Sequence, residues 1–306
     1  MSFPIFTHAD MAAHAPGSGH AERPERLSAV LDALHDSDLA LRWEPAPLAT
    51  RAEIERVHPK AYVDRIFAAE PLEGLETLDP DTHMSPGSLN AGLRAAGALV
   101  EAVRQLADGR FDRAFCAIRP PGHHAERSTA MGFCLFSSVA IAAYAACSAG
   151  FERVAVVDFD VHHGNGTQSI FETDESLFFA SIHQSPLYPG TGDPSETGVG
   201  NIVNTTTPPD APRELWRQRF ETVLMPAVDA FAPDLILISA GFDAHRRDPL
   251  AHQHLEASDF AWATRAITAV ARRHAKGRVV SSLEGGYDLE ALGQSAVAHV
   301  RALGEG

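Results

Sequence analysis

The chain has 306 residues, of which 45% are hydrophobic and 21% charged, a composition that fits a globular protein and excludes collagens, coiled coils and disordered chains. Its 25 Lys and Arg residues against 40 Asp and Glu residues give a formal charge of −15, which argues against a nucleic-acid binder and suits a cationic substrate. Three cysteines without metal-type spacing argue against a disulfide framework, and we expect buried thiols in a cytoplasmic protein without a signal peptide.

Short apolar runs alternate with helical patterns along the chain. Strands are expected at 113–118, 153–159, 177–182, 234–239 and 278–283, and helices at 88–106, 137–148, 213–231 and 258–275. Because the strands are apolar on both faces and alternate with helices, they predict an α/β three-layer sandwich with a mainly parallel central sheet. No linker or repeat interrupts this pattern, so we expect a single domain over residues 1–306.

One uncharged stretch, 131–151, is long enough on paper to span a bilayer. It is made largely of Ala, Ser and Gly, which are only weakly apolar. We therefore expect a helix buried in the core and no membrane partner.

The chemically reactive residue types gather just after the predicted strands. In an open parallel sheet the carboxyl ends of the strands share one edge, and ligands bind at that edge. The residues that could converge there are Arg119 to His124, Asp158 to Asn165, His183, Asp243 and Tyr287.

A metal site is indicated after the strand 153–159. Residues two apart on an extended chain point the same way, so Asp158, Asp160 and His162 can face one space. Oxygen and nitrogen ligands suit zinc, and catalytic zinc sites use three protein ligands with one open position. Asp243 is the third candidate ligand, after the strand 234–239. Any one of these residues alone would be read as a helix cap or ion-pair partner, but three at one sheet edge favour a metal.

Two further features predict acid–base chemistry beside the metal. His123 and His124 follow a rigid Pro-Pro-Gly turn, and histidine titrates near neutral pH as a general base or acid must. Tyr287 follows two glycines after a buried strand, where its hydroxyl could donate to a developing oxyanion.

Six ordered motifs together make the chain similar to the histone deacetylase and acetylpolyamine amidohydrolase family, whose members share the arginase-like α/β fold. The resemblance extends from about His20 to Tyr287. It is carried by Arg119-Pro-Pro-Gly-His-His124, Gly132-Phe133-Cys134, Asp158-Phe-Asp-Val-His-His-Gly-Asn165, Tyr188-Pro-Gly-Thr-Gly-Asp193, Ala240-Gly-Phe-Asp243 and Leu283-Glu-Gly-Gly-Tyr287, and by the N-terminal segment His20–Arg26.

The resemblance implies zinc-dependent hydrolysis of an acylated amine. It implies one zinc ion bound by Asp160, His162 and Asp243, and a potassium ion near Asp158, Asp160, His162 and Ser181. It further implies a catalytic pair His123 and His124, with Asp158 behind the first and Asn165 behind the second, a carbonyl-polarising Tyr287, and a channel lined by Gly132, Phe133 and Tyr188. We expect His124 to act as base and acid and His123 to supply positive charge.

Two positions depart from the more frequent family pattern. Residue 165 is Asn where many members have Asp, and an uncharged partner should stabilise protonated His124 less than a carboxylate would. Residue 188 is Tyr where Phe is frequent, which predicts a more polar channel rim.

Alternatives of other classes are an arginase-type ureohydrolase and a non-catalytic module that binds acylated ligands. Arginases hold two manganese ions with additional carboxylates, but Gly164 and His245 occupy the matching places, so we expect one metal and a solvent-facing His245. A non-catalytic module would lack part of the reactive set, which is complete here. Iron(II) is an alternative to zinc for a ligand set of two Asp and one His.

The substrate remains open between acyl-lysine and N-acetylpolyamines, since both carry an amide on a slim apolar stem followed by positive charge. Asp79 and Asp81 lie where the family places an acidic residue that grips substrate, and the sequence does not decide between them or exclude plain solvated carboxylates. Oligomeric state and acyl-chain preference are not indicated either. The short chain predicts an open channel mouth.

Overall fold

The computed structural model describes residues 2–305. Eight parallel strands form the central sheet in the order β2-β1-β5-β10-β9-β6-β7-β8. Their bounds are β1 Phe3–Thr7, β2 Leu41–Pro45, β5 Arg113–Cys116, β6 Val154–Asp158, β7 Leu177–Gln184, β8 Ile202–Thr207, β9 Leu235–Ala240 and β10 Val279–Leu283. A separate antiparallel hairpin pairs β3 (Glu76–Asp79) with β4 (Thr82–Met84).

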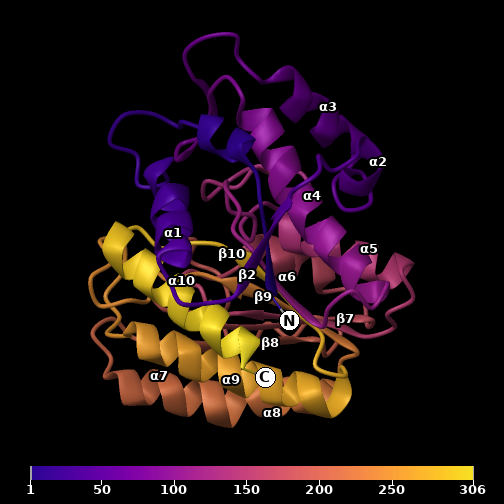
Figure 1. The fold of residues 1–306 in the computed structure, drawn as a ribbon, viewed down its shortest axis with the longest axis vertical. Helices are drawn as coiled ribbons and strands as arrows, with labels where there is room; N and C mark the ends of the chain where they lie inside the picture. Colours follow the sequence, from indigo (N-terminus) through magenta and orange to yellow (C-terminus); the bar gives the residue numbers. More distant parts are fainter. Residues whose placement is uncertain (1, 306) are drawn as a thin grey trace.

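Helices cover both faces of the sheet, which confirms the predicted three-layer α/β class (Figure 1). One layer contains α4 and α5, and the opposite layer contains α7 to α10 with α1 packed on α10. The helices are α1 Glu25–His35, α2 Arg51–Ile54, α3 Lys60–Ala68, α4 Ser88–Ala107, α5 Ser138–Ser148, α6 Asn165–Phe171, α7 Arg213–Arg219, α8 Met225–Phe231, α9 Ala257–His274 and α10 Leu289–Gly304. A 3-10 turn at Ala9–Ala13 precedes α1, and a π-helical turn at Phe220–Leu224 joins α7 to α8.

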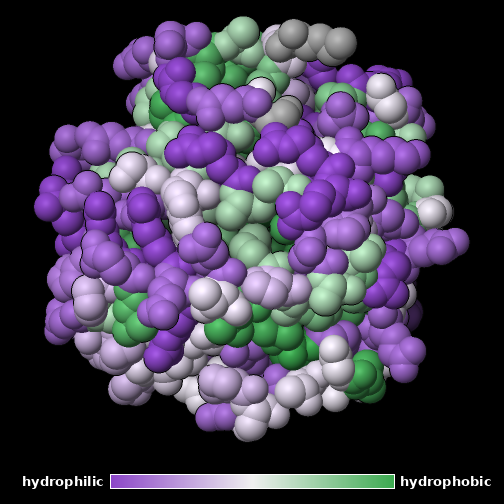
Figure 2. Space-filling view, turned by 90° about the horizontal axis from the view of Figure 1, so that it is seen from below, coloured by the Kyte–Doolittle hydropathy of each residue, from purple (hydrophilic) through white to green (hydrophobic). Residues whose placement is uncertain are grey.

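The central strands are the most apolar part of the sheet because helices cover both of their faces. Every residue of β5, β6, β7, β9 and β10 is buried. The edge strand β2 is only half-buried. On the outer side of the α7–α9 layer, hydrophilic residues surround interspersed apolar ones (Figure 2).

The uncharged stretch at 131–151 contains the short helix α5, which is buried along most of its length. None of the helices within residues 2–305 combines the length and the apolar character that a membrane crossing requires. The expectation of three buried thiols holds for Cys116 and Cys134 but is wrong for Cys147, which is half-buried. Cys147 lies in the last turn of α5, where the helix approaches the surface.

Four neighbouring strands carry the loops that matter for function. β5, β10, β9 and β6 are consecutive in the sheet, and all run parallel. Their carboxyl ends therefore lie side by side, although the loops that follow them are far apart in the sequence.

Candidate active site

Two carboxylates and one imidazole meet at this edge of the sheet. His162 Nδ1 lies 3.1 Å from Asp160 Oδ1 and 3.1 Å from Asp243 Oδ2. All three residues are buried, and one ligand atom from each lies within 4.8 Å of the others. Glycines make room for them: a Cβ at Gly285 would lie 2.1 Å from Asp243 Oδ2, and one at Gly241 would lie 2.0 Å from Asp160 Oδ2.

The two carboxylates of this triad favour the binding of a cation. Burial disfavours the charged form of His162, but the hydrogen bonds and charges of Asp160 and Asp243 outweigh it and raise the pKa of His162 to about 10. Burial raises the pKa of Asp243, and the neighbouring charge of Asp160 raises it further. Two buried carboxylates beside a nitrogen donor are a ligand set that zinc accepts, so the residues present fit the implied metal. Within residues 2–305 this is the one such group of three metal-ligating side chains.

His123 and His124 lie next to the triad, and each ring has its own hydrogen-bond partner. His123 Nδ1 lies 3.0 Å from Asp158 Oδ2, and His124 Nδ1 lies 2.8 Å from Asn165 Oδ1. Asn165 Nδ2 donates to Glu126 Oε1 at 2.9 Å, which directs the amide oxygen towards His124. Because that oxygen can only accept, His124 Nδ1 carries the hydrogen, and Nε2 is left with a free lone pair.

The two histidines differ in charge. Burial opposes a charged His123, but Asp160 and Asp158 outweigh it and raise its pKa to about 10. Burial lowers the pKa of His124 well below its usual value, and the positive charges of His123 and His162 lower it further. The pair therefore combines a cationic His123 with a neutral His124, which is the combination that a general base beside a fixed positive charge requires.

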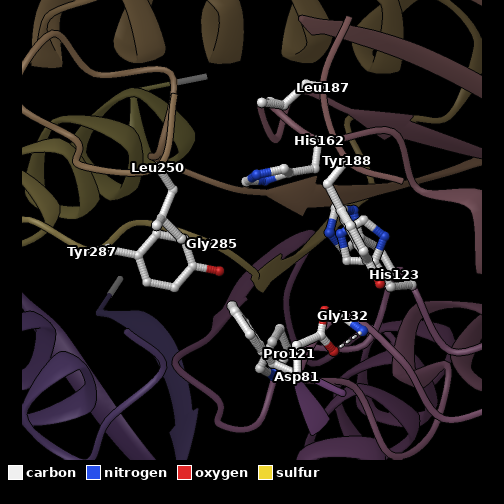
Figure 3. Close-up of a pocket in the computed structure, with 12 residues that line it drawn as sticks. Asp81, Pro121, His123, Gly132, His162, Leu187, Tyr188, Leu250, Gly285 and Tyr287 are labelled. Carbon is white, nitrogen blue, oxygen red and sulfur yellow. Dashed lines mark hydrogen bonds between the residues drawn. The ribbon is translucent and has the colours of Figure 1, made fainter. Parts of the chain in front are cut away.

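Tyr287 faces the histidines across a cavity of about 200 Å³ (Figure 3). Its hydroxyl points into the cavity, and its ring packs edge-on against Phe133 with centroids 5.9 Å apart. Burial raises the pKa of Tyr287, so the hydroxyl keeps its proton and can act as a donor. Arg26 holds this segment from behind, with its guanidinium 4.8 Å from the Tyr287 ring and Nε donating to the carbonyl of Gly286.

The wall of the cavity opposite the metal ligands depends on an unusual backbone. Gly132 and Phe133 have φ values of 57° and 69°, in the left-handed region. The hairpin β3–β4 holds both: Gly132 N–H donates to Asp81 Oδ1, and Phe133 N–H donates to Thr82 Oγ1, each at 3.0 Å. A Cβ at position 132 would lie 2.3 Å from His124 Cδ2, so only glycine allows this approach.

The structure thus brings the predicted histidine, tyrosine and channel residues to one cavity, together with His162 of the metal triad. Asp160 and Asp243 contact His162 from outside the cavity lining, and Asp158 and Asn165 contact His123 and His124 in the same way. The cavity is also lined by Pro121 and Gly285, which belong to the predicted motifs, and by Asp81, which the sequence left undecided. Leu187 and Leu250 line it as well, and the sequence did not indicate them. The Asp81 carboxylate accepts a hydrogen bond from the Gly132 N–H. The other candidate, Asp79, is half-buried. His183, expected at the same edge, belongs to β7 and contacts Ser181 Oγ and the carbonyl of Gly192.

The expectation of a solvent-facing His245 is wrong. Its side chain is only 6% exposed, because the loop after β9 folds back and forms a bridge between His245 and Leu255. His245 Nδ1 accepts the Arg247 N–H at 3.2 Å, so the ring shapes this loop and stays outside the metal triad.

Sequence and structure comparisons agree with this geometry. Residues 20–303 match the histone deacetylase domain. The chain belongs to the histone deacetylase family. It is 38% identical to a probable deacetylase of Archaeoglobus fulgidus over 94% of this chain and 81% of that protein. It is also 38% identical to a histone deacetylase-like amidohydrolase of Pseudomonas aeruginosa, over 88% of this chain and 73% of the relative.

A solved structure of a related domain supports the same assignment. The HDA15 HD domain superposes with a TM-score of 0.92 at 33% sequence identity, covering 98% of this chain and 90% of that one. These findings confirm the predicted family and the predicted deacetylase function. The protein is a deacetylase of the amidohydrolase type.

Proposed function

We propose that this deacetylase is a one-zinc hydrolase that removes acetyl or another short acyl group from an amine. The observation that carries the proposal is the cavity in which His162 of the Asp160, His162 and Asp243 triad faces a neutral His124 and a protonated Tyr287. A zinc ion held by the triad would lower the pKa of a water molecule and polarise the amide carbonyl.

His124 performs both proton transfers in this mechanism. Its free Nε2 accepts a proton from the attacking water as the new carbon–oxygen bond forms. The same nitrogen then gives that proton to the amine as the carbon–nitrogen bond breaks, so the products are a short carboxylic acid and a free amine. His123, held cationic beside Asp158, stabilises the negative charge that develops between the two steps.

Tyr287 stabilises the tetrahedral oxyanion by donating its hydroxyl hydrogen. A donor of this kind is commonly worth about 3–4 kcal/mol. Tyr287→Phe should therefore lower kcat by about 10²- to 10³-fold while zinc content stays unchanged. A Tyr287→Phe enzyme with the wild-type kcat would contradict this role.

The substrate that we propose is acyl-lysine, in a protein or a small molecule. Phe133, Leu187, Tyr188 and Leu250 make the cavity walls largely apolar, which suits the slim methylene stem of such a side chain. N-acetylpolyamines have a similar stem and are the alternative. Hydrolysis of an acetyl-lysine peptide and of acetylated putrescine at matched concentration distinguishes them: faster cleavage of the peptide supports the proposal, and faster cleavage of the polyamine contradicts it.

We also propose a structural potassium ion beside the zinc ligands. Asp158 on β6 pairs in register with Ser181 on β7, so oxygen-bearing residues of two neighbouring strands lie side by side just before Asp160 and His162 in the chain. Hard cations of this kind prefer oxygen ligands. Metal analysis after dialysis against sodium and against potassium buffers tests this, since selective retention of potassium is expected.

A further inference from the structure

The segment that carries Tyr287 is held on several sides by groups from elsewhere in the chain. Phe242 N–H donates to the carbonyl of Gly285 at 2.9 Å, and Gly285 N–H donates to Asp160 Oδ2 at 2.8 Å. These bonds fix the start of the segment. The backbone N–H of Tyr287 itself donates to Asp248 Oδ2 at 2.7 Å.

Asp248 has a second backbone partner on the channel wall. Its Oδ1 accepts the N–H of Leu250 at 3.0 Å, and Leu250 lines the cavity beside Tyr287 (Figure 3). One carboxylate therefore ties two segments that are 37 residues apart in the chain. One of them carries the oxyanion donor and the other carries an apolar wall of the substrate channel.

The position of this carboxylate is costly. The residue is only 8% exposed, and burial together with the charge of Asp243 raises the pKa of Asp248 to about 7. Its two oxygens accept hydrogen bonds from backbone N–H groups. A neutral side chain could accept such bonds at a lower free-energy cost of desolvation. A buried carboxylate that accepts hydrogen bonds from two backbone N–H groups at once can fix the distance between those two groups, because each of its oxygens binds one of them.

We infer that Asp248 is a positioning residue that sets where the Tyr287 hydroxyl stands relative to the Leu250 wall of the channel. The inference rests on the proposed function, because it assigns Tyr287 a part in the reaction. Asp248 does not line the cavity and acts through Tyr287. Its effect should therefore appear in kcat when the Tyr287 hydroxyl is present and vanish when that hydroxyl is absent.

A neighbouring ion pair provides a matched control. Arg247 reaches out to the surface and contacts Asp288, which accepts the N–H of Ala291 at the start of α10. Asp288 is thus a carboxylate next to Tyr287 in sequence that also accepts a backbone amide, but it does not hold Tyr287. Asn is an equally good helix cap, so Asp288→Asn should leave kcat within about twofold of wild type.

The test is a double-mutant cycle with Asp248→Ala and Tyr287→Phe on the zinc-loaded enzyme. Asp248→Ala alone should lower kcat by about 10- to 100-fold, since small displacements of a catalytic group have effects of this size. In the Tyr287→Phe background the same change should lower kcat by less than about twofold. Asp248→Asn keeps one acceptor oxygen and should give an intermediate kcat, which guards against misfolding of the Ala variant.

Two results would overturn the inference. Equal fold-losses of kcat in both backgrounds would show a general structural role, and an unchanged kcat in Asp248→Ala would show no role. Both leave the proposed function standing as long as Tyr287→Phe alone is slow. If Tyr287→Phe retained the wild-type kcat, the proposed function and this inference would fail together.

Discussion

His123 and His124 lie with ring centroids 4.0 Å apart, yet their surroundings drive their pKa values in opposite directions. Two carboxylates raise the pKa of His123 to about 10 against the effect of burial. Burial and the cationic neighbours lower that of His124 well below its usual value. The pair can therefore hold one positive charge and one free lone pair at the same pH, although both residues are histidine.

The uncharged Asn165 should set the acidic limit of activity. Asn165→Asp places a negative charge 2.8 Å from His124 Nδ1 and favours the imidazolium, so the pKa of His124 should rise by about one unit or more. Since the neutral form acts as the base, the acidic limb of the kcat/KM profile should move to higher pH. The change is best made with Glu126→Gln, because Glu126 contacts the same amide, and Glu126→Gln alone is the control. An acidic limb that stays in place would count against His124 as the base.

Gly132 should not tolerate even one added methyl group. Gly132→Ala would drive a Cβ into the His124 ring, so kcat/KM should fall by about 10²-fold or more. Gly74→Ala is the matched control: its φ of 72° imposes similar backbone strain, but nothing lies within 4 Å of the new Cβ. Comparable activity loss in both variants would show that backbone strain, rather than contact with His124, is responsible.

His58 should make folding stability depend on pH. Its Nδ1 lies 3.0 Å from the Arg127 carbonyl, and its Nε2 accepts the Ser137 N–H, so one neutral ring fixes both ends of the loop that carries Gly132 and Phe133. Burial lowers the pKa of His58 to about 4 from an unfolded value of 6.5. Between these two pH values the unfolded chain therefore binds a proton at His58 that the folded state does not bind. The stability present above pH 6.5 is lost as the pH falls towards 4.

The expected loss between pH 7.5 and pH 5 is about 2 kcal/mol of unfolding free energy from this residue. Urea unfolding of wild type and His58→Gln at both pH values measures it, with zinc saturating throughout. Other buried histidines titrate in both proteins, so the difference between their pH dependences isolates His58. Identical pH dependences in the two proteins would contradict the assignment.

The central strands could be predicted from the sequence because their burial on both faces leaves a continuous apolar run. The two edge strands, β2 and β8, and the neighbouring strand β1 could not. β8 is rich in Thr, β2 has the half-buried sequence LRWEP, and β1 contains a proline. Long helices such as α4 and α9 were predicted to within two residues at each end, since their apolar periodicity extends over several turns.

The site residues could be identified where residue type reveals chemistry, as for the metal triad and the histidine pair. Asp248 could not, because it accepts the backbone N–H of a residue 39 positions away, and a backbone amide leaves no sequence signal. The burial of His245 could not be predicted for the same reason: the loop folds back over it through backbone contacts. The pairing of Glu22 with Arg119, a buried ion pair behind the Pro-Pro-Gly turn, likewise depends on tertiary structure.

The central claim is that Asp160, His162 and Asp243 hold one catalytic divalent ion. Titration of the metal-free enzyme with zinc, with activity measured at each addition, tests it most directly. We predict negligible activity at the start and a plateau at about one zinc per chain, reached in wild type and absent in Asp243→Ala. Full activity before any zinc is added, or a plateau that requires about two ions per chain, would contradict the account.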